Sequence, residues 1–186
     1  MKINIKEIFL MLISIIHGSL FFIFLDKMKE IVDSGISFYY FSILLFSFCM
    51  FIRVLQSQVL AAIRYEELWN VKTLDIFIIF IIAGFEYFML HFISKSAWTY
   101  SILLITFALI GILGYIITFF SIKKRNSIEA YIQGLNIFIL LVIAAISVLG
   151  ILSNTTLSYS IAYLFNSFFL IVNIYFSIKL GMKSDV

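Results

Sequence analysis

The few residues of this chain that could carry ion chemistry stand inside long apolar runs. Glu86 is the one acid deep within such a run, and His17 and Asn166 lie well inside two others. At a helical rise of 1.5 Å per residue, Glu86 and Asn166 lie about 18 Å from one end of their runs, and His17 about 13 Å. Ionisable groups inside a membrane usually face protein or water, so these residues are a candidate ion or proton site. The alternative is structural, with a protonated Glu86 hydrogen-bonded to a neighbouring helix.

A second candidate layer consists of asparagines. Asn136 and Asn173 each lie near one end of their runs. In both cases this end lies on the same side of the membrane as the start of the run that contains Glu86. Asn166 and Asn173 are seven residues apart. That spacing places both side chains of the last run on one helical face. Polar residues at this spacing hold membrane helices together through hydrogen bonds of about 0.6–2 kcal/mol each. A pore lining would use the same spacing, so assembly and conduction both stay open.

The residue types needed for other chemistry are scarce. The chain has two His and one Cys. Cys49 and His91 belong to opposite ends of their runs, about 20 Å apart in depth, so they form no nucleophile–base pair. These residues cannot make a structural zinc site unaided, and no glycine-rich phosphate loop is present. We therefore expect a non-enzymatic protein without cofactor or metal.

The composition defines the protein class that must position these residues. The chain has 186 residues, of which 63% are hydrophobic and 12% are charged, and it lacks proline. A water-soluble domain has about 25% charged residues, so a soluble globular protein is excluded. A single Cys excludes a disulfide scaffold. The basic residues mark the ends of apolar runs and form no stripe, which argues against direct binding of nucleic acid.

Six apolar runs are long enough to be membrane spans, because a bilayer core of about 30 Å needs about 20 apolar residues in a helix. The runs are apolar at both odd and even positions, which favours helices over transmembrane strands. We predict an all-α integral membrane protein, a six-transmembrane-helix bundle forming one domain over residues 1–186. Residues 26–35 are expected to form an outer loop. The predicted spans are 8–25, 36–52, 74–93, 97–122, 131–152 and 159–178.

Lys and Arg set the expected orientation. With six spans, ten of the 13 basic residues fall on one side and only Lys27, Lys29 and Lys95 on the other. By the positive-inside rule, both termini are then cytoplasmic. The proline-free sequence, rich in Ile, Phe, Lys and Asn, resembles the product of an AT-rich bacterial gene. The expected location is therefore the bacterial inner membrane.

The cytoplasmic segment Arg53–Lys72 lacks Gly and Pro and should continue the second span as a helix to about residue 72. Its apolar face includes Leu55 and Val59, which predicts an amphipathic helix. One interpretation is an interfacial helix with Tyr65 and Trp69 at the lipid headgroups. The other is a docking surface for a cytosolic protein or another subunit, because mixed charges suit protein recognition. The candidate docking residues are Arg53, Arg64, Glu66, Glu67, Lys123, Lys124 and Arg125.

Small residues in the fourth and fifth runs favour close helix packing. Gly114 and Thr118 form a small-x-x-x-small pair, which lets two helix backbones approach each other. Further small residues of this kind are Gly111, Ser121, Ala144, Ser147 and Gly150. They would serve contacts within one subunit or between copies in a homo-oligomer.

Two family resemblances follow from these features. In size, composition and the segment Arg53–Lys72, the chain resembles the small multi-spanning membrane subunits of bacterial anti-phage defence systems of the Kiwa type. That resemblance implies an oligomer that works with a cytosolic partner. The six-span plan with both termini inside is similar to the substrate-binding membrane component of energy-coupling-factor transporters, although their alanine-rich coupling motif does not occur in Lys6–Leu25.

Three functions are therefore expected in order. The first is a non-enzymatic oligomeric membrane subunit that anchors or signals to a cytosolic partner, with a change of membrane permeability in anti-phage defence. The second is a small-solute transporter, or its substrate-binding membrane subunit, with a site at Glu86 and Asn166. The third is an ion channel lined by Asn166 and Asn173.

Overall fold

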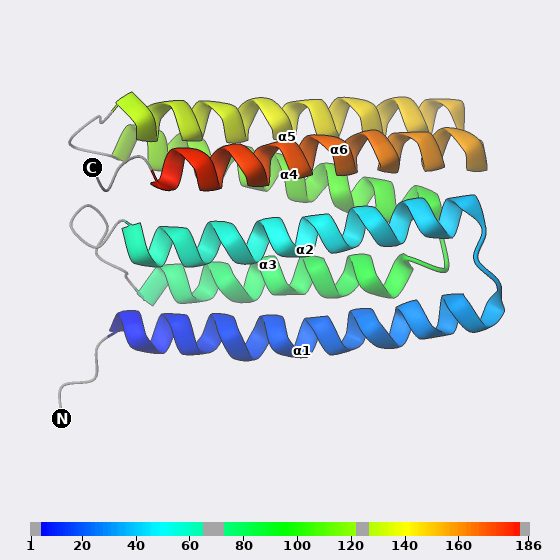
Figure 1. Cartoon of the computed structure of the whole chain (residues 1–186), viewed down its shortest axis with the longest axis horizontal. Helices are drawn as coiled ribbons and strands as arrows, with labels where there is room; N and C mark the ends of the chain where they lie inside the picture. The colour runs from blue at the N-terminus through cyan, green and yellow to red at the C-terminus, as the bar shows by residue number, and fades with distance from the viewer. Residues whose placement is uncertain (1–4, 65–72, 122–126, 183–186) are drawn as a thin grey trace.

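The structure is a computed structural model that describes residues 5–64, 73–121 and 127–182. Over these residues it consists of six α-helices and no strands (Figure 1). Consecutive helices run antiparallel, so that Ile5 and Met182 lie at the same end of the bundle. The helices are α1 (Ile5–Ser34), α2 (Phe38–Arg64), α3 (Thr73–Phe92), α4 (Ala97–Ser121), α5 (Ser127–Ser153) and α6 (Thr156–Met182).

Short polar segments start and end the helices at the other end of the bundle. Gly35 ends α1 with a φ of 99°, a left-handed conformation that glycine adopts without steric cost. The Ser37 hydroxyl accepts the backbone N–H of Tyr40 at the start of α2. At the start of α6, Thr155 and Ser158 form a reciprocal capping box, each side-chain oxygen accepting the backbone N–H of the other residue at 3.1 Å. These caps fix the tight connections between α1 and α2 and between α5 and α6.

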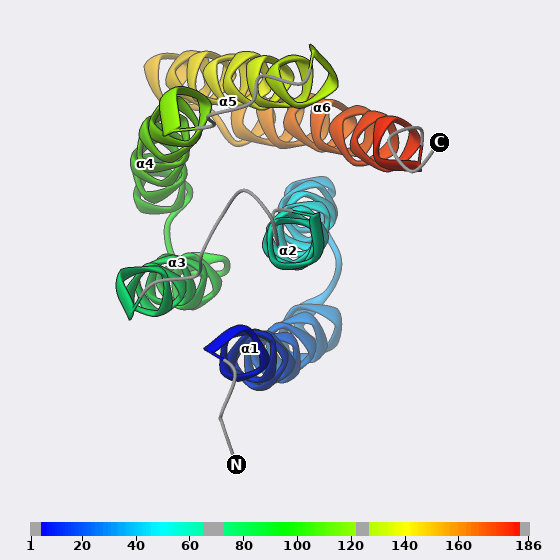
Figure 2. The same ribbon diagram turned by 90° about the vertical axis from the view of Figure 1, so that its left-hand side faces the viewer.

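The six helices form a closed ring of neighbours. Seen from the end, each helix packs against two others, in the order α1, α2, α6, α5, α4, α3 and back to α1 (Figure 2). Large apolar side chains fill the centre. Every helix contributes to this main core, which includes Ile31, Phe46, Met89, Tyr100, Ile143 and Tyr163.

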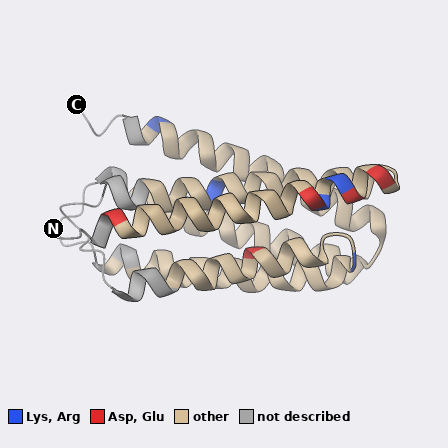
Figure 3. Cartoon of the chain, turned by 90° about the horizontal axis from the view of Figure 1, so that it is seen from below, with Lys and Arg blue, Asp and Glu red and all other residues tan. Residues whose placement is uncertain are grey.

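The polarity of the bundle is the reverse of that of a soluble protein. Large apolar side chains point outward on every helix, and examples are Phe22, Phe48, Phe88, Leu113, Leu149 and Phe168. The buried side chains include His17, Arg53, Glu86 and several amides. Figure 3 shows that the charged residues of the described part gather mainly toward the two ends of the bundle. This distribution is typical of a protein surrounded by lipid.

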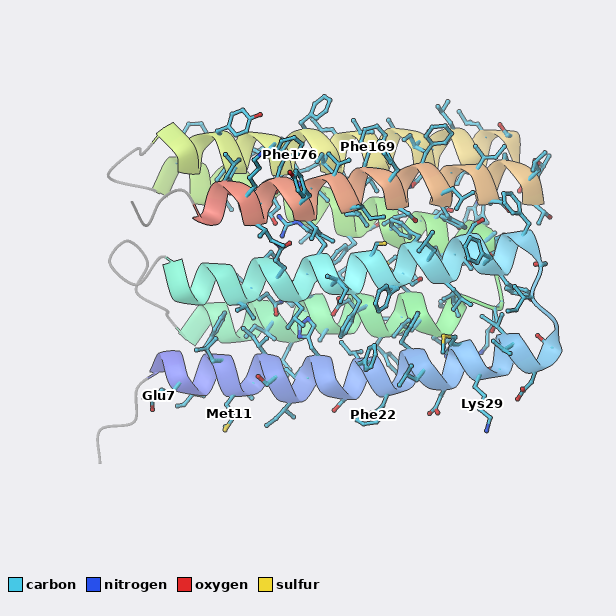
Figure 4. All side chains as sticks on the ribbon, in the orientation of Figure 1. Glu7, Met11, Phe22, Lys29, Phe169 and Phe176 are labelled. Carbon is cyan, nitrogen blue, oxygen red and sulfur yellow. The ribbon has the colours of Figure 1, made fainter. Side chains whose placement is uncertain are left out.

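The outward face of α1 shows this polarity along its length. Glu7, Met11, Phe22 and Lys29 point away from the other helices (Figure 4). Charges stand only at the two ends of this stripe, and Met11 and Phe22 are more than half exposed between them. The hydroxyl of the exposed Ser14 donates to a carbonyl of its own helix, which satisfies it without water. The stripe from Glu7 to Lys29 is about 33 Å long, close to the thickness of a bilayer core.

Five helices are long and apolar enough to cross a membrane. The qualifying segments are Glu7–Ser34, Phe38–Val59, Ala97–Ile117, Tyr131–Ser153 and Thr156–Leu180. α3 corresponds to the remaining predicted span, and its described apolar part, Ile78–Phe92, is shorter. The structure therefore agrees with the predicted all-helical membrane class, with five qualifying helices where the sequence predicted six spans.

The first two helices differ in extent from the prediction. α1 continues through most of the predicted outer loop and ends at Ser34, because the segment Asp26–Ser34 contains no Gly or Pro and Lys27 pairs with Glu30 one turn away. The charged residues of this segment therefore do not end the helix. α2 continues beyond the predicted end of the span at residue 52 and ends at Arg64. The rest of the predicted extension, residues 65–72, lies outside the described residues.

Candidate functional site

The first buried polar centre joins α1 to α3. His17 and Glu86 are each 2% exposed, and the Nε2 atom of His17 lies 3.5 Å from the Oε2 atom of Glu86. The Nδ1 atom of His17 lies 3.1 Å from the carbonyl oxygen of Ile13, one turn earlier in α1. Since a carbonyl only accepts hydrogen bonds, Nδ1 must carry a proton, and Nε2 is left to face the carboxyl group.

This geometry lets the pair share one proton. Either Glu86 is protonated and faces a neutral imidazole, or the proton sits on Nε2 and the two groups form an ion pair. Neither form carries net charge, which suits an apolar surrounding. The distance of 3.5 Å is slightly longer than a hydrogen bond, so neither Nε2 nor the carboxyl oxygens have a hydrogen-bond partner in the described structure.

Asn166 lies apart from this pair. The sequence placed Asn166 at the depth of Glu86, but its side chain on α6 faces α5. The Nδ2 atom of Asn166 donates to the Ser147 hydroxyl at 3.1 Å, and its Oδ1 atom has no hydrogen-bond partner among the described residues. The structure thus brings together two of the three residues of the expected layer. Equal depth did not imply proximity, because α3 and α6 are not neighbours in the ring.

The second polar centre joins α2, α5 and α6. Arg53 is 8% exposed, and its Nε atom donates to Oδ1 of Asn173. Its Nη2 atom donates to Oδ1 of Asn136 at 2.7 Å, and the Nδ2 atom of Asn173 donates to the same Asn136 oxygen at 3.1 Å. The Ser177 hydroxyl completes the group by donating to Asn173 at 3.4 Å. The two asparagines expected to form one layer therefore do meet, with an arginine between them.

The position of Arg53 differs from the sequence interpretation, in which it belonged to a cytoplasmic docking surface. The inward face of α2 carries Ile43, Phe46 and Met50, and Arg53 comes next on the same face at i+3 from Met50. This periodicity was the signal that could have placed Arg53 inside the bundle. Of the other predicted docking residues, Arg64 ends α2 and its side chain is not described, and Glu66, Glu67, Lys123, Lys124 and Arg125 lie outside the described residues.

The apolar face predicted beyond the second span also packs inside the bundle. Leu55 and Val59 contact a small core formed by Phe9, Ile13 and Ile79. This part of α2 therefore packs against α1 and α3, and over these residues it is an ordinary bundle helix.

Buried hydroxyl groups, which the sequence reasoning missed, cross the centre of the ring. The hydroxyl groups of Ser47 and Tyr100 lie 2.7 Å apart, and those of Ser101 and Tyr163 lie 2.9 Å apart. These contacts connect α2 to α4 and α4 to α6, which are not neighbours in the ring. They hold the half of the bundle that lies away from Ile5 and Met182.

Cys49 and His91 are the residues that the sequence analysis considered for a metal site or a Cys–His pair. Cys49 is a buried free thiol, and His91 lies beside Lys95, whose Nζ atom is 2.8 Å from its Nε2 atom. Within residues 5–64, 73–121 and 127–182, no group of three or more His, Cys, Asp and Glu side chains is arranged to hold a metal ion.

The two polar centres lie at nearly one depth, on opposite faces of α2. The ring of His17 packs against Phe51, with the ring centroids 5.5 Å apart. Arg53 follows Phe51 by two residues, about 3 Å along the axis and about 160° around it. One face of α2 thus covers the proton-sharing pair, and the other carries a guanidinium group. Chemically, the bundle can hold a proton at the first centre and can bind negative charge at the second.

No protein-family model, curated protein or solved structure matches the chain.

Proposed function

We propose that this protein is a membrane-embedded subunit that transports a small solute together with a proton. The observation that carries the proposal is the His17–Glu86 pair, an ionisable carboxyl and an imidazole buried together inside a bundle in which five helices are long and apolar enough to cross a membrane. Ionisable residues in such positions are costly, and proton relays of pumps and transporters are built from them. The proposed location is the bacterial inner membrane, with both ends of the chain in the cytoplasm.

The surroundings of the pair support proton binding over a purely structural role. α2 covers the pair with the apolar ring of Phe51, and Lys27–Glu30 near the end of α1 is the only other ion pair in the described part of the chain. A carboxyl that served only to connect helices would donate to a nearby acceptor at hydrogen-bond distance. Here the carboxyl oxygens face Nε2 of His17 at 3.5 Å, and this nitrogen can itself take up the proton, so the pair can gain or lose one proton.

Proton movement tests this proposal directly. Purified protein is reconstituted into vesicles that contain a pH-sensitive dye, and a pH gradient is imposed in buffers containing chloride, nitrate, acetate, sulfate or phosphate. The wild-type protein should collapse the gradient faster than protein-free vesicles in at least one of these buffers. Glu86→Gln keeps the size and polarity of the side chain but cannot ionise, so its vesicles should behave as protein-free vesicles.

The matched control is Glu30→Gln, which removes a largely exposed carboxylate from the same protein. Its proton flux should equal that of the wild type. If wild-type vesicles hold the gradient as well as protein-free vesicles do in every buffer, the proposed transport function is rejected. Equal flux in Glu86→Gln and wild type would reject the role of the pair.

We propose transport ahead of docking of a cytosolic partner. The docking hypothesis included Arg53, and this residue lies inside the bundle. Participation in anti-phage defence and the formation of an oligomer stay predictions from the sequence. Co-purification of the full chain from its native host would test for an oligomer and for a cytosolic partner.

A further inference from the structure

The guanidinium group of Arg53 has more hydrogen-bond donors than its neighbours accept. Arginine offers five N–H groups in one plane. In this structure Nε donates to Asn173 and Nη2 donates to Asn136, whereas the buried Nη1 atom has no hydrogen-bond partner among the described residues. The unused donors, both on Nη1 and one on Nη2, form the end of the guanidinium fork.

The charge of Arg53 is likewise uncompensated. Both acceptors are neutral amide oxygens, and no carboxylate of the described chain lies within 4.0 Å of the guanidinium, since the ion pairs found there are His17–Glu86 and Lys27–Glu30. Arginine keeps its proton in proteins, so the group cannot neutralise itself. A buried positive charge of this kind is stable only with a negative partner.

The asparagines hold the guanidinium in one orientation. Asn173 accepts from Nε and also donates to Asn136, so neither amide can turn without losing a hydrogen bond. The fork end is therefore presented in a fixed direction, from a position about 17 Å before the end of α2. A planar fork held in this way fits two oxygen atoms of one anion.

We infer that Arg53, positioned by Asn136 and Asn173, is a binding site inside the bundle for a small oxyanion, such as a carboxylate or an inorganic phosphate or sulfate. The inference rests on the proposed function in one respect, because the anion would be the solute that accompanies the proton. An anion carried with one proton crosses the membrane with reduced net charge, which lowers the cost of its passage.

Anion-dependent stability tests the inference without any transport measurement. Purified protein in detergent micelles, in a low-salt buffer, is titrated at constant ionic strength with chloride, nitrate, formate, acetate, sulfate or phosphate, and Tm is recorded. A bound anion stabilises the folded state, so at least one oxyanion should raise Tm saturably, and chloride should raise it less.

Arg53→Gln should abolish the anion-dependent rise in Tm, whereas Lys179→Gln, which removes an exposed cation of α6, should retain it. If Arg53→Gln does not fold, Arg53→Lys retains the charge without the fork and should lose the preference for oxyanions over chloride. Equal Tm in all salts for the wild type, or an unchanged rise in a folded Arg53 variant, would overturn the inference.

A lipid headgroup offers the same phosphate chemistry and is distinguished by a second titration with phosphatidylglycerol in the micelles. A rise in Tm that only the lipid causes, and that Arg53→Gln abolishes, identifies the phosphate as a headgroup. The transport proposal fails separately. A saturable rise in Tm with no proton flux rejects transport and keeps the site, whereas flux that depends on Glu86 without any anion effect keeps transport and rejects the site.

Discussion

Asn136 and Asn173 matter because of the charge that they surround. Each amide oxygen accepts from the Arg53 guanidinium, and the Nδ2 atom of Asn173 links the two amides. Removing the acceptor of a buried donor costs more folding free energy when the donor belongs to a charged group than when it belongs to a neutral one. The stability of this centre should therefore depend on both asparagines together.

Asn173→Ala should lower the free energy of unfolding by about 1–3 kcal/mol, because it leaves the buried Nε donor of Arg53 without an acceptor. Unfolding by denaturant in micelles, followed by circular dichroism, measures this change. Ser14→Ala, which removes an exposed hydroxyl from α1, is the control and should have little effect.

The double variant Arg53→Met with Asn173→Leu tests whether the two residues contribute to stability together or independently. Replacing both partners of a buried polar interaction by apolar groups usually costs less than removing one of them. In the same unfolding experiment, a double variant that is less stable than Asn173→Leu by the full effect of Arg53→Met would show that the two residues act independently.

At these positions the sequence could suggest pairs but could not choose between them. Helix rise alone placed His17, Glu86 and Asn166 at similar depths, and only the order of helices around the ring separated Asn166 from the others. Arg53 was missed because a basic residue after an apolar run was taken as the end of a span. The buried stripe of α2 continues through it, since its neighbours on α5 and α6 provide amide oxygens.

The ends of the helices depend on local backbone chemistry. α1 stops at Gly35 because the backbone there has positive φ, and α6 starts with the Thr155–Ser158 capping box. Charges do not end these helices, as α1 shows by continuing past Asp26. The sequence therefore predicted the number of helices and their order along the chain. It predicted the helix ends well only where short polar loops separate the helices.

Gly35→Ala should destabilise the protein by about 1–2 kcal/mol, because a side chain is strained in the left-handed region. Gly18→Ala is the matched control, since Gly18 lies within α1 and a Cβ atom added there meets nothing within 4 Å. That change should raise the free energy of unfolding by up to about 1 kcal/mol. Thermal unfolding of both variants in one detergent gives the comparison, and equal effects would contradict it.

Close approach between helices is also local. A Cβ atom at Gly111 would lie 2.9 Å from Leu140, and one at Gly150 would lie 3.3 Å from Ala162, whereas Gly114 has space around the added atom. Of the glycines predicted to mediate packing, Gly111 and Gly150 therefore do so within the subunit. Gly150→Leu should destabilise the bundle, and Gly114→Leu should be tolerated in unfolding experiments on the monomer.

The closed ring of helices gives the molecule two different ends. Both described termini lie at one end, and the tight connections after α1, α3 and α5 lie at the other (Figure 1). The positive-inside bias predicts that the first end is cytoplasmic. Counting charges gives this prediction of orientation, but the sequence could not predict the order of helices around the ring, because an apolar helix in lipid carries little sequence information about its neighbours.

Labelling with a membrane-impermeant maleimide tests the orientation. Single cysteines are introduced as Lys95→Cys and Lys179→Cys in a Cys49→Ser background, and intact cells are treated. Lys95→Cys should react and Lys179→Cys should react only after the cells are opened, since both positions are exposed but lie at opposite ends of the bundle. Reaction of both in intact cells would place them on one face and remove the basis for every assigned depth.

The outward stripe of α1 between Glu7 and Lys29 has a practical consequence for handling the protein. Its length of about 33 Å should match vesicles made of lipids with long acyl chains. In thinner bilayers, hydrophobic mismatch would force the helices to tilt or the bilayer to stretch around them. Because α1 carries His17, such tilting would alter its approach to α3, so proton flux measured in short-chain lipids should fall below that in long-chain lipids.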